Sequence, residues 1–170
     1  MEESVALRSY FQAHKQEMID TLAAWVAVPS VRGDAKPGMP YGAEPARMLK
    51  LALEQCAALG FQTESVANCM GSVELNDLPA ALAVLCHLDV VPAGEGWSQD
   101  PFVLIYRQDT DRLYGRGAID NKGPAVAALY AMRAIRELHI PMKHGVRLLL
   151  GTDEENGSSD LTAYLQQRTM

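Results

Sequence analysis

Three short segments of the chain carry imidazole and carboxylate side chains that suit metal chemistry. The first, "AVLCHLD", ends in His87 and Asp89, and the second, "YGRGAIDNKGP", contains Asp120. The third, "GTDEEN", contains the adjacent carboxylates of Glu154 and Glu155. Imidazole nitrogens and carboxylate oxygens are ligands for Zn²⁺ and similar divalent ions. Because each segment follows a predicted strand or hairpin, the three together indicate a metal site more specifically than any one alone.

His87 and Asp89 lie two positions apart at the end of an apolar run. Residues two apart in a strand point to the same face, so the two side chains can act together. The Asp89 carboxylate can accept the second N–H of the His87 ring, which fixes the tautomer and raises the basicity of the nitrogen left for a metal. The alternative is a strand-end histidine that a neighbouring carboxylate merely satisfies.

The segment around Asp120 contains Gly115 and Gly117, which permit tight backbone geometry ahead of the carboxylate. A phosphate-binding loop is a rival interpretation, but the segment has neither the Walker pattern nor the glycine pattern of dinucleotide-binding loops. A charged turn that caps the following helix with Asp120 or Asn121 remains open as an alternative.

The third segment places three carboxylates, Asp153, Glu154 and Glu155, directly after a predicted buried strand. Three adjacent negative charges repel one another, and a bound divalent cation relieves that repulsion. One glutamate can then bind the metal while the other accepts a proton from water, which is the division of roles that a metallohydrolase needs. A solvated acidic loop remains the alternative.

Composition excludes several classes of protein. The 170 residues include 15 Lys and Arg against 21 Asp and Glu, a net charge of -6, with no basic block, so nucleic acid is not an expected partner. No apolar run approaches the roughly 20 residues that cross a bilayer, so no membrane is expected. The three cysteines lack metal-type spacing and the N-terminus lacks a secretory pattern, which indicates a reduced, cytoplasmic protein.

Helix and strand patterns alternate along the chain, which predicts an α/β domain with a mixed sheet flanked by helices. Helices are expected over residues 4–28, 45–60, 124–138 and from 160 onward. Strands are expected over residues 61–67, 71–76, 80–87 and 145–152, and a hairpin from 102–107 and 112–117. The first helix is long and amphipathic, and the apolar run at 80–87 predicts a strand buried on both faces. The Pro- and Gly-rich stretch between Pro29 and Pro45 is interpreted as a loop within the same domain.

The three segments resemble, in the same order, the N-terminal motifs of the co-catalytic zinc peptidase family of aminoacylase and carboxypeptidase type. The matching stretches are "HLDVVPAGEGW", "GRGAIDNKGP" and "GTDEENGS". That family includes aminoacylase-type enzymes, bacterial dipeptidases, acetylornithine deacetylase and succinyl-diaminopimelate desuccinylase. The motifs are most similar to the bacterial dipeptidase V branch, and the resemblance spans essentially the whole chain.

The resemblance implies a site for two divalent metal ions, Zn²⁺ in the first place, with Mn²⁺ or Co²⁺ as alternatives. His87 matches the ligand of one metal and Glu155 a ligand of the other, while Asp120 matches the carboxylate that bridges both. Asp89 matches the residue that orients the histidine and Glu154 the general base, so these two are the candidate catalytic residues. The family also has a cis peptide bond after the bridging aspartate, which predicts one after Asp120.

The implied function is metal-dependent hydrolysis of dipeptides or short peptides, in which the glutamate base activates a water that bridges the metals. An N-acyl amino acid deacylase, of acetylornithine deacetylase or succinyl-diaminopimelate desuccinylase type, is the second enzyme hypothesis. A non-catalytic, truncated binding protein is the third hypothesis. Neither the resemblance nor the composition indicates an oligomeric state.

In the family, further metal ligands and a small lid domain follow the third motif. Residues 1–170 are therefore expected to form the N-terminal part of the catalytic metallopeptidase domain. This chain alone is then expected to bind metal weakly, or to bind a single ion, and to be inactive as a hydrolase. The remaining histidines are not expected to replace the downstream ligands; they are His14, His139 and His144.

Overall fold

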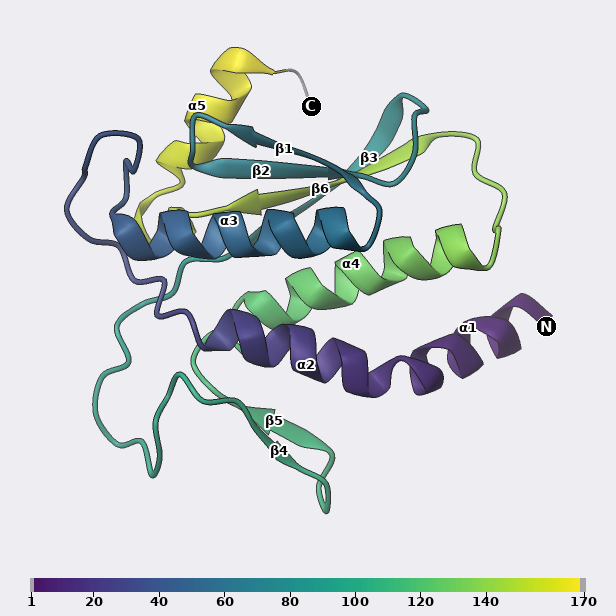
Figure 1. Cartoon of the computed structure of the whole chain (residues 1–170), viewed down its shortest axis with the longest axis horizontal. Coiled ribbons are helices and arrows are strands. Elements are labelled where there is room, and N and C mark those ends of the chain that lie inside the picture. Colours follow the sequence, from purple (N-terminus) through teal and green to yellow (C-terminus); the bar gives the residue numbers. More distant parts are fainter. Residues whose placement is uncertain (1, 169–170) are drawn as a thin grey trace.

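The computed structural model describes residues 2–168 and shows an α/β domain built around a mixed, four-stranded sheet (Figure 1). The strands, in spatial order, are β1 (Gln62–Val66), β2 (Met70–Glu74), β6 (Gly145–Gly151) and β3 (Ala80–His87). Strand β2 pairs antiparallel with both β1 and β6, whereas β3 and β6 run parallel. The predicted mixed sheet flanked by helices is therefore confirmed.

Helices cover both faces of the sheet, with most of them on one side (Figure 1). Helices α3 (Ala43–Ala58) and α4 (Lys122–Glu137) pack on one face, and the short helix α5 (Ser159–Gln167) lies on the other. Helices α1 (Glu2–Ala13) and α2 (Lys15–Val26) form an outer layer against α4. The main core lies between this helical side and the sheet, and its buried members include Trp25, Met48, Leu129, Tyr130 and Leu148.

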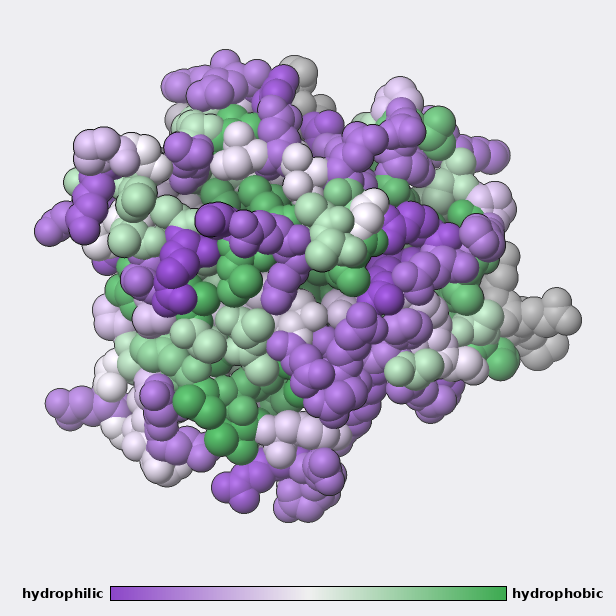
Figure 2. All heavy atoms as spheres, viewed as in Figure 1, coloured by the Kyte–Doolittle hydropathy of each residue, from purple (hydrophilic) through white to green (hydrophobic). Residues whose placement is uncertain are grey.

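The outer surface of the helical layer is largely polar. Figure 2 shows hydrophilic residues gathered over the N-terminal half of α2 and the C-terminal part of α4, whereas apolar residues gather between the C-terminal end of α2 and the β4–β5 hairpin (residues 105–114). The Arg133 guanidinium joins α4 to α2 through an ion pair with Glu17 at 2.7 Å, and it also pairs with Glu137 of its own helix at 2.7 Å. Within residues 2–168, no helix combines the length and the apolar character needed to span a bilayer.

The single long N-terminal helix predicted over residues 4–28 is wrong, because the structure has two helices with a turn at His14. The His14 backbone leaves the helical region, with φ -100° and ψ 7°, and its ring Nδ1 lies 2.8 Å from the Tyr10 carbonyl oxygen. The His14 ring also stacks on the Tyr10 ring, with centroids 4.0 Å apart. The His14 N–H still donates to the same Tyr10 carbonyl oxygen at 3.0 Å, so the ring shares this acceptor with the backbone. The segment contains neither Pro nor Gly, so its pattern carries no signal of the break.

Strand β3 is not buried on both faces, and this prediction from its apolar run is wrong. The strand lies at an edge of the sheet: β6 pairs with one side, and no strand in the described part of the chain pairs with the other. Leu82 and Leu85 are 56% and 51% exposed, whereas Leu149 of the central strand β6 is fully buried. An apolar run indicates that a strand suits burial but does not reveal whether other elements cover both of its faces.

The parallel pairing of β3 and β6 determines where the candidate site lies, because the carboxyl ends of parallel strands meet at the same edge of a sheet. His87 is the last residue of β3 and lies opposite Gly151, the last residue of β6. A short 3-10 helix, Glu154–Asn156, follows β6 at this edge. The predicted hairpin is confirmed as β4 (Ile105–Arg107) and β5 (Arg112–Tyr114), and a loop leads from it into α4.

Candidate metal centre

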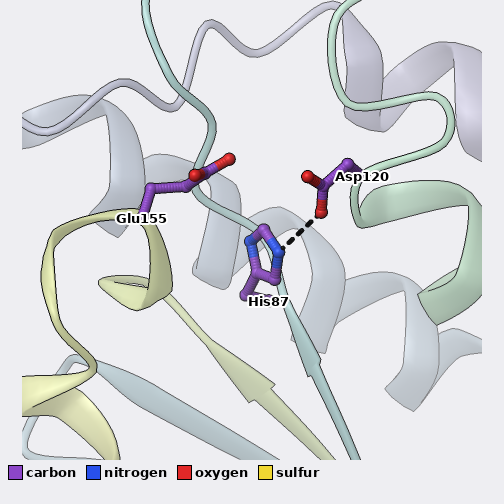
Figure 3. Close-up of side chains that lie close together, drawn as sticks. All are labelled: His87, Asp120 and Glu155. Atoms are coloured by element: carbon purple, nitrogen blue, oxygen red, sulfur yellow. Dashed lines mark hydrogen bonds and ion pairs between the residues drawn. The ribbon is translucent and has the colours of Figure 1, made fainter.

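Side chains from the three segments meet at the carboxyl edge of the sheet (Figure 3). Ligand atoms of His87, Asp120 and Glu155 all lie within 4.8 Å of one another. They come from the end of β3, the loop before α4 and the turn after β6. Figure 3 shows the three side chains facing a common centre, and His87 Nε2 lies 3.0 Å from an Asp120 carboxylate oxygen. Residues far apart in the sequence therefore form one cluster.

His87 has partners on both ring nitrogens. The residue is 7% exposed, and its Nδ1 lies 3.1 Å from the Asp89 carbonyl oxygen and 3.5 Å from the Asp89 carboxylate. Burial alone lowers the pKa of His87, but the hydrogen bonds and negative charges of Asp89 and Asp120 outweigh burial and raise the pKa to about 9. The ring therefore holds a proton near neutral pH, and a metal ion must displace that proton to bind.

Asp89 connects the two segments that follow β3 and β6. Its side chain is fully buried, and its two carboxylate oxygens accept the backbone N–H groups of Glu154 and Glu155, each at 3.1 Å. The residue types predict only the contact with His87, because a bond to a distant backbone N–H leaves no trace in a sequence. Asp89 thus ties the histidine to the turn that carries both glutamates.

The adjacent glutamates differ in their surroundings. The Glu154 side chain is 55% exposed, and its Oε2 lies 3.7 Å from His87 Nε2. Glu155 faces the cluster, where burial and the nearby negative charge of Asp120 raise its pKa. A carboxylate whose ionised form is disfavoured in this way gains from a bound cation. Glu155 is thus better placed as a ligand, and Glu154 is better placed to reach a water or a substrate.

Asp120 lies in the loop that leads into α4, and its side chain is 68% exposed. The peptide bond between Asp120 and Asn121 is cis, as the family resemblance predicts. Close backbone packing fixes the loop behind Asp120, since a Cβ placed on Gly123 would lie 2.1 Å from the Ala118 carbonyl oxygen. Position 123 therefore has room for glycine alone.

We expect Gly123→Ala to displace the loop that carries Asp120, because the new methyl group overlaps a backbone atom. The free energy of unfolding should fall by about 1–3 kcal/mol, as for other overpacked sites, and the affinity for a divalent metal should fall by about tenfold. Gly33→Ala is the matched control for stability, because no atom lies within 4 Å of a Cβ at that position. Urea unfolding and metal titration measure the two effects, and equal free energies of unfolding for the two variants would contradict the steric explanation.

Lys122 anchors the same loop to the backbone near the end of α2. The residue is fully buried, and its Nζ donates to the carbonyl oxygens of Trp25 at 2.9 Å and Val28 at 2.8 Å, near the end of α2. Burial lowers the pKa of Lys122 to about 7. A lysine at a helix start is usually exposed, so its residue type carries no signal of this anchoring role.

The donor set of the cluster fits a divalent metal ion. One imidazole nitrogen and two carboxylates form a mixed nitrogen and oxygen ligand set that suits zinc, manganese or cobalt. The carboxylates of Asp120, Glu154 and Glu155 also surround a single titratable ring, so the cluster carries excess negative charge that a cation balances.

Comparison with known proteins identifies the family. The profile of Peptidase family M20/M25/M40 matches residues 83–169, a range that contains all three segments. The chain belongs to Peptidase family M20/M25/M40. The predicted membership of a metallopeptidase family is thus confirmed, and the M20 chain is a peptidase-family domain with an α/β fold.

Relatives of the M20 chain with dipeptidase names match nearly all of it. A Bacillus subtilis protein named "Putative dipeptidase YtjP" is 35% identical over 158 residues, which are 92% of this chain and 34% of the relative. A Staphylococcus haemolyticus protein named "Putative dipeptidase SH1171" is 35% identical over 161 residues, 94% of this chain and 34% of the relative. The M20 chain therefore spans about a third of the length of these relatives.

Solved structures share the fold of the M20 chain. Human carnosine dipeptidase 1 superimposes with a TM-score of 0.80 and 28% identity, over 98% of this chain and 38% of that protein. The metallo-carboxypeptidase Sso-CP2 of Sulfolobus solfataricus gives a TM-score of 0.72 and 26% identity, over 89% and 34% of the two chains. The di-peptidase Dug1p of Saccharomyces cerevisiae, with a TM-score of 0.82 and 20% identity over 98% and 38% of the two chains, shows likeness of fold alone.

All five candidate site residues of the M20 chain lie at the carboxyl edge of the sheet. His87, Asp120 and Glu155 converge, Asp89 lies beside Nδ1 of the histidine, and Glu154 lies near its Nε2. The other histidines lie outside this cluster, one between α1 and α2 and two between α4 and β6; they are His14, His139 and His144.

Proposed function

We propose that this chain provides the N-terminal part of the catalytic domain of a metal-dependent dipeptidase. His87, Asp120 and Glu155 would hold divalent metal, Zn²⁺ in the first place. The observation that carries the proposal is the convergence of these ligand atoms within 4.8 Å, with Glu154 beside them. The dipeptidase names of the relatives support dipeptides as the substrate class.

Peptide hydrolysis needs a polarised carbonyl group, an activated water and a proton for the departing amine. Divalent ions, when bound, act as Lewis acids on the carbonyl and lower the pKa of water. Glu154 would supply the proton transfer: its exposed carboxylate accepts a proton from the attacking water and then donates it to the departing amine. Asp89 keeps Glu154 at the site, because it accepts the Glu154 backbone N–H at 3.1 Å.

The direct test uses the polypeptide that the source cells produce, captured with an antibody raised against this chain. Intact mass spectrometry first establishes its length. The purified polypeptide should hydrolyse dipeptides, lose this activity on treatment with a chelator and regain it with Zn²⁺ or Mn²⁺. N-acyl amino acids form the second substrate series, because a deacylase of the same family would cleave these instead. A polypeptide that cleaves neither series and holds no metal would reject the proposal.

The 170-residue chain by itself is expected to bind one divalent ion, weakly, and to show no useful hydrolysis. Within residues 2–168, three side chains form the ligand cluster, which is the number of protein ligands that a catalytic site gives to one zinc ion, so no ligand set is left for a second ion. Isothermal titration calorimetry with Zn²⁺ or Mn²⁺ gives the stoichiometry, and His87→Ala should abolish binding. Tight binding of two ions together with robust turnover would contradict this expectation.

Metal binding to this chain should depend on pH through His87. Its pKa is raised to about 9, so below pH 9 a proton competes with the metal for the ring. The affinity should rise by about tenfold per pH unit between pH 6 and pH 9 and then level off. At pH 7 binding should release about one proton, which calorimetry in buffers of different ionisation enthalpy measures. An affinity that is constant over this range would contradict a protonated ring in the metal-free site.

We further propose that the protein works in the cytoplasm. Its three cysteines, Cys56, Cys69 and Cys86, are buried and unpaired, a state that a reducing compartment maintains. Burial raises the pKa of each of these thiols, which keeps them protonated and unreactive. Cell fractionation followed by immunoblotting tests this assignment.

A further inference from the structure

A loop outside the metal cluster contacts both segments that carry the cluster. Residues 29–42, called the strap below, connect α2 to α3. On one side, the hydroxyl of fully buried Ser30 donates to the Leu88 carbonyl oxygen at 2.6 Å, and the Ser30 carbonyl accepts the Val90 N–H at 3.1 Å. These bonds fix the strap on either side of Asp89.

On the other side, Arg32 of the strap forms an ion pair with Asp153. Asp153 directly precedes the two glutamates, and its side chain is fully buried, whereas the Arg32 side chain is 40% exposed. The other carboxylate oxygen of Asp153 accepts the hydroxyl of Ser159 at 2.5 Å and its backbone N–H at 3.2 Å. Arg32 thus supplies the positive charge that balances a buried carboxylate beside the metal cluster.

Tyr41, at the other end of the strap, holds Arg32 in place. The Arg32 guanidinium lies 5.0 Å from the centre of the Tyr41 ring, which is cation–π geometry. The Tyr41 hydroxyl lies 2.9 Å from Ser159 Oγ. The two ends of the strap lie against each other. The Gly33 N–H donates to the Tyr41 carbonyl at 3.0 Å, and a Cβ on Gly42 would lie 3.0 Å from the Gly33 backbone. Arg32 is therefore preorganised to meet Asp153.

The backbone of Asp153 also stabilises the turn that carries the two glutamates. Its carbonyl oxygen accepts the N–H groups of Asn156 at 3.2 Å and Ser158 at 2.9 Å, and its own N–H donates to buried Asp160 at 3.1 Å. Removal of one partner of a buried ion pair leaves an uncompensated charge in the interior. Without Arg32, the Asp153 carboxylate would have to move towards water, and the turn would move with it.

We propose that Arg32 is a positioning residue for the metal centre. By pairing with Asp153, it fixes the turn that presents both glutamates to His87 and Asp120. This inference rests on the proposed function in one respect, namely that the cluster binds a divalent ion. Because the Arg32 side chain is partly exposed, its substitution removes an interaction without emptying the core.

Titration of the 170-residue chain with Co²⁺ tests this role, since the visible absorption of bound Co²⁺ reports its coordination geometry. Arg32→Met should weaken Co²⁺ binding by about tenfold or more and change the absorption spectrum at saturation. Arg32→Lys keeps the positive charge but loses the planar guanidinium contacts, so its loss of Co²⁺ affinity should be smaller than that of Arg32→Met. Arg47→Met is the matched control, because Arg47 pairs with Glu44 on the exposed side of α3 and should leave binding unchanged.

A double variant tests whether Arg32 acts through Asp153. Arg32→Met combined with Asp153→Asn should bind Co²⁺ as Asp153→Asn alone does, because the carboxylate that needs Arg32 is gone. Additive losses in the double variant would overturn the proposal. An Arg32→Met affinity equal to that of the unaltered chain would also overturn it.

Thermal unfolding checks that each variant is folded. If Arg32→Met does not fold, comparison of Arg32→Lys with Arg47→Lys decides the question, and equal Co²⁺ affinities of these two variants overturn the proposal. His87→Ala distinguishes the metal-binding function from the positioning role of Arg32. Unchanged Co²⁺ binding by His87→Ala would reject the proposed function, whereas binding that His87→Ala abolishes and Arg32→Met leaves intact would reject only the positioning role.

Discussion

Replacing Glu154 with glutamine is expected to lower dipeptide hydrolysis by the polypeptide from the source cells by about 10²–10⁴-fold. Glutamine has nearly the same shape as glutamate, but its side-chain amide cannot accept a proton from the attacking water. The Glu154 carboxylate is close to the cluster, since its Oε2 lies 3.7 Å from His87 Nε2. Glu154 is not among the three residues whose ligand atoms converge, so the bound metal should be retained. Steady-state rates, together with metal content from elemental mass spectrometry, measure both parts of this expectation.

Glu155→Gln is the matched control for this experiment, because it makes the same substitution at the neighbouring residue. Its expected effect is loss of metal, since Glu155 belongs to the converging cluster. The activity of Glu155→Gln should therefore recover in part when the metal concentration is raised, whereas that of Glu154→Gln should not. The reverse pattern would show that the two glutamates have been assigned the wrong roles.

Asp89→Ala is expected to have the second large effect, on both stability and metal binding. The substitution leaves the backbone N–H groups of Glu154 and Glu155 without their acceptor and removes the carboxylate beside His87. Each unsatisfied donor costs about 1–3 kcal/mol, so the free energy of unfolding should fall by about 2–5 kcal/mol. The metal affinity should fall by about 10–100-fold. Urea unfolding and Co²⁺ titration of the 170-residue chain measure these losses.

Asp100→Ala provides the control for Asp89→Ala. Asp100 also accepts a backbone N–H, that of Phe102 at 2.9 Å, but in an exposed loop where water can replace the carboxylate. Its substitution should change the free energy of unfolding by less than about 1 kcal/mol and leave metal binding unchanged. An Asp89→Ala variant that matches this control in both measurements would contradict the connecting role of Asp89.

The fold could be predicted from the sequence wherever apolar periodicity and turn residues agree. The strand that became β6 and the helix that became α4 are long, strongly patterned and bounded by Gly or Pro, and the structure has them where expected. The break at His14 could not be predicted, because no Pro or Gly marks it and the contacts of the His14 ring with Tyr10 leave no sign in the sequence. The exposure of Leu82 and Leu85 could not be predicted either, because it depends on which elements cover the faces of β3.

The candidate site could be predicted as a set of residue types, but its supporting contacts could not. Imidazole and carboxylate groups after predicted strands singled out the members of the cluster, because strand ends at one edge of a sheet bring side chains together. The supports are of another kind: Lys122 donates to two backbone carbonyls, and Asp89 accepts two backbone N–H groups. Every residue carries such backbone groups, so neither composition nor spacing marks which ones are used.

The parallel pairing of β3 with β6 also separates the members of the proposed ligand set widely along the chain. The β4–β5 hairpin and α4 lie between these strands, so His87 and Glu155 meet only when this long crossover has closed. Closing such a loop costs chain entropy, and the complete ligand set exists only in the folded chain. An ion bound by this set would therefore favour the folded chain over the unfolded chain by mass action. The resistance of the chain to unfolding would then rise with the free metal concentration.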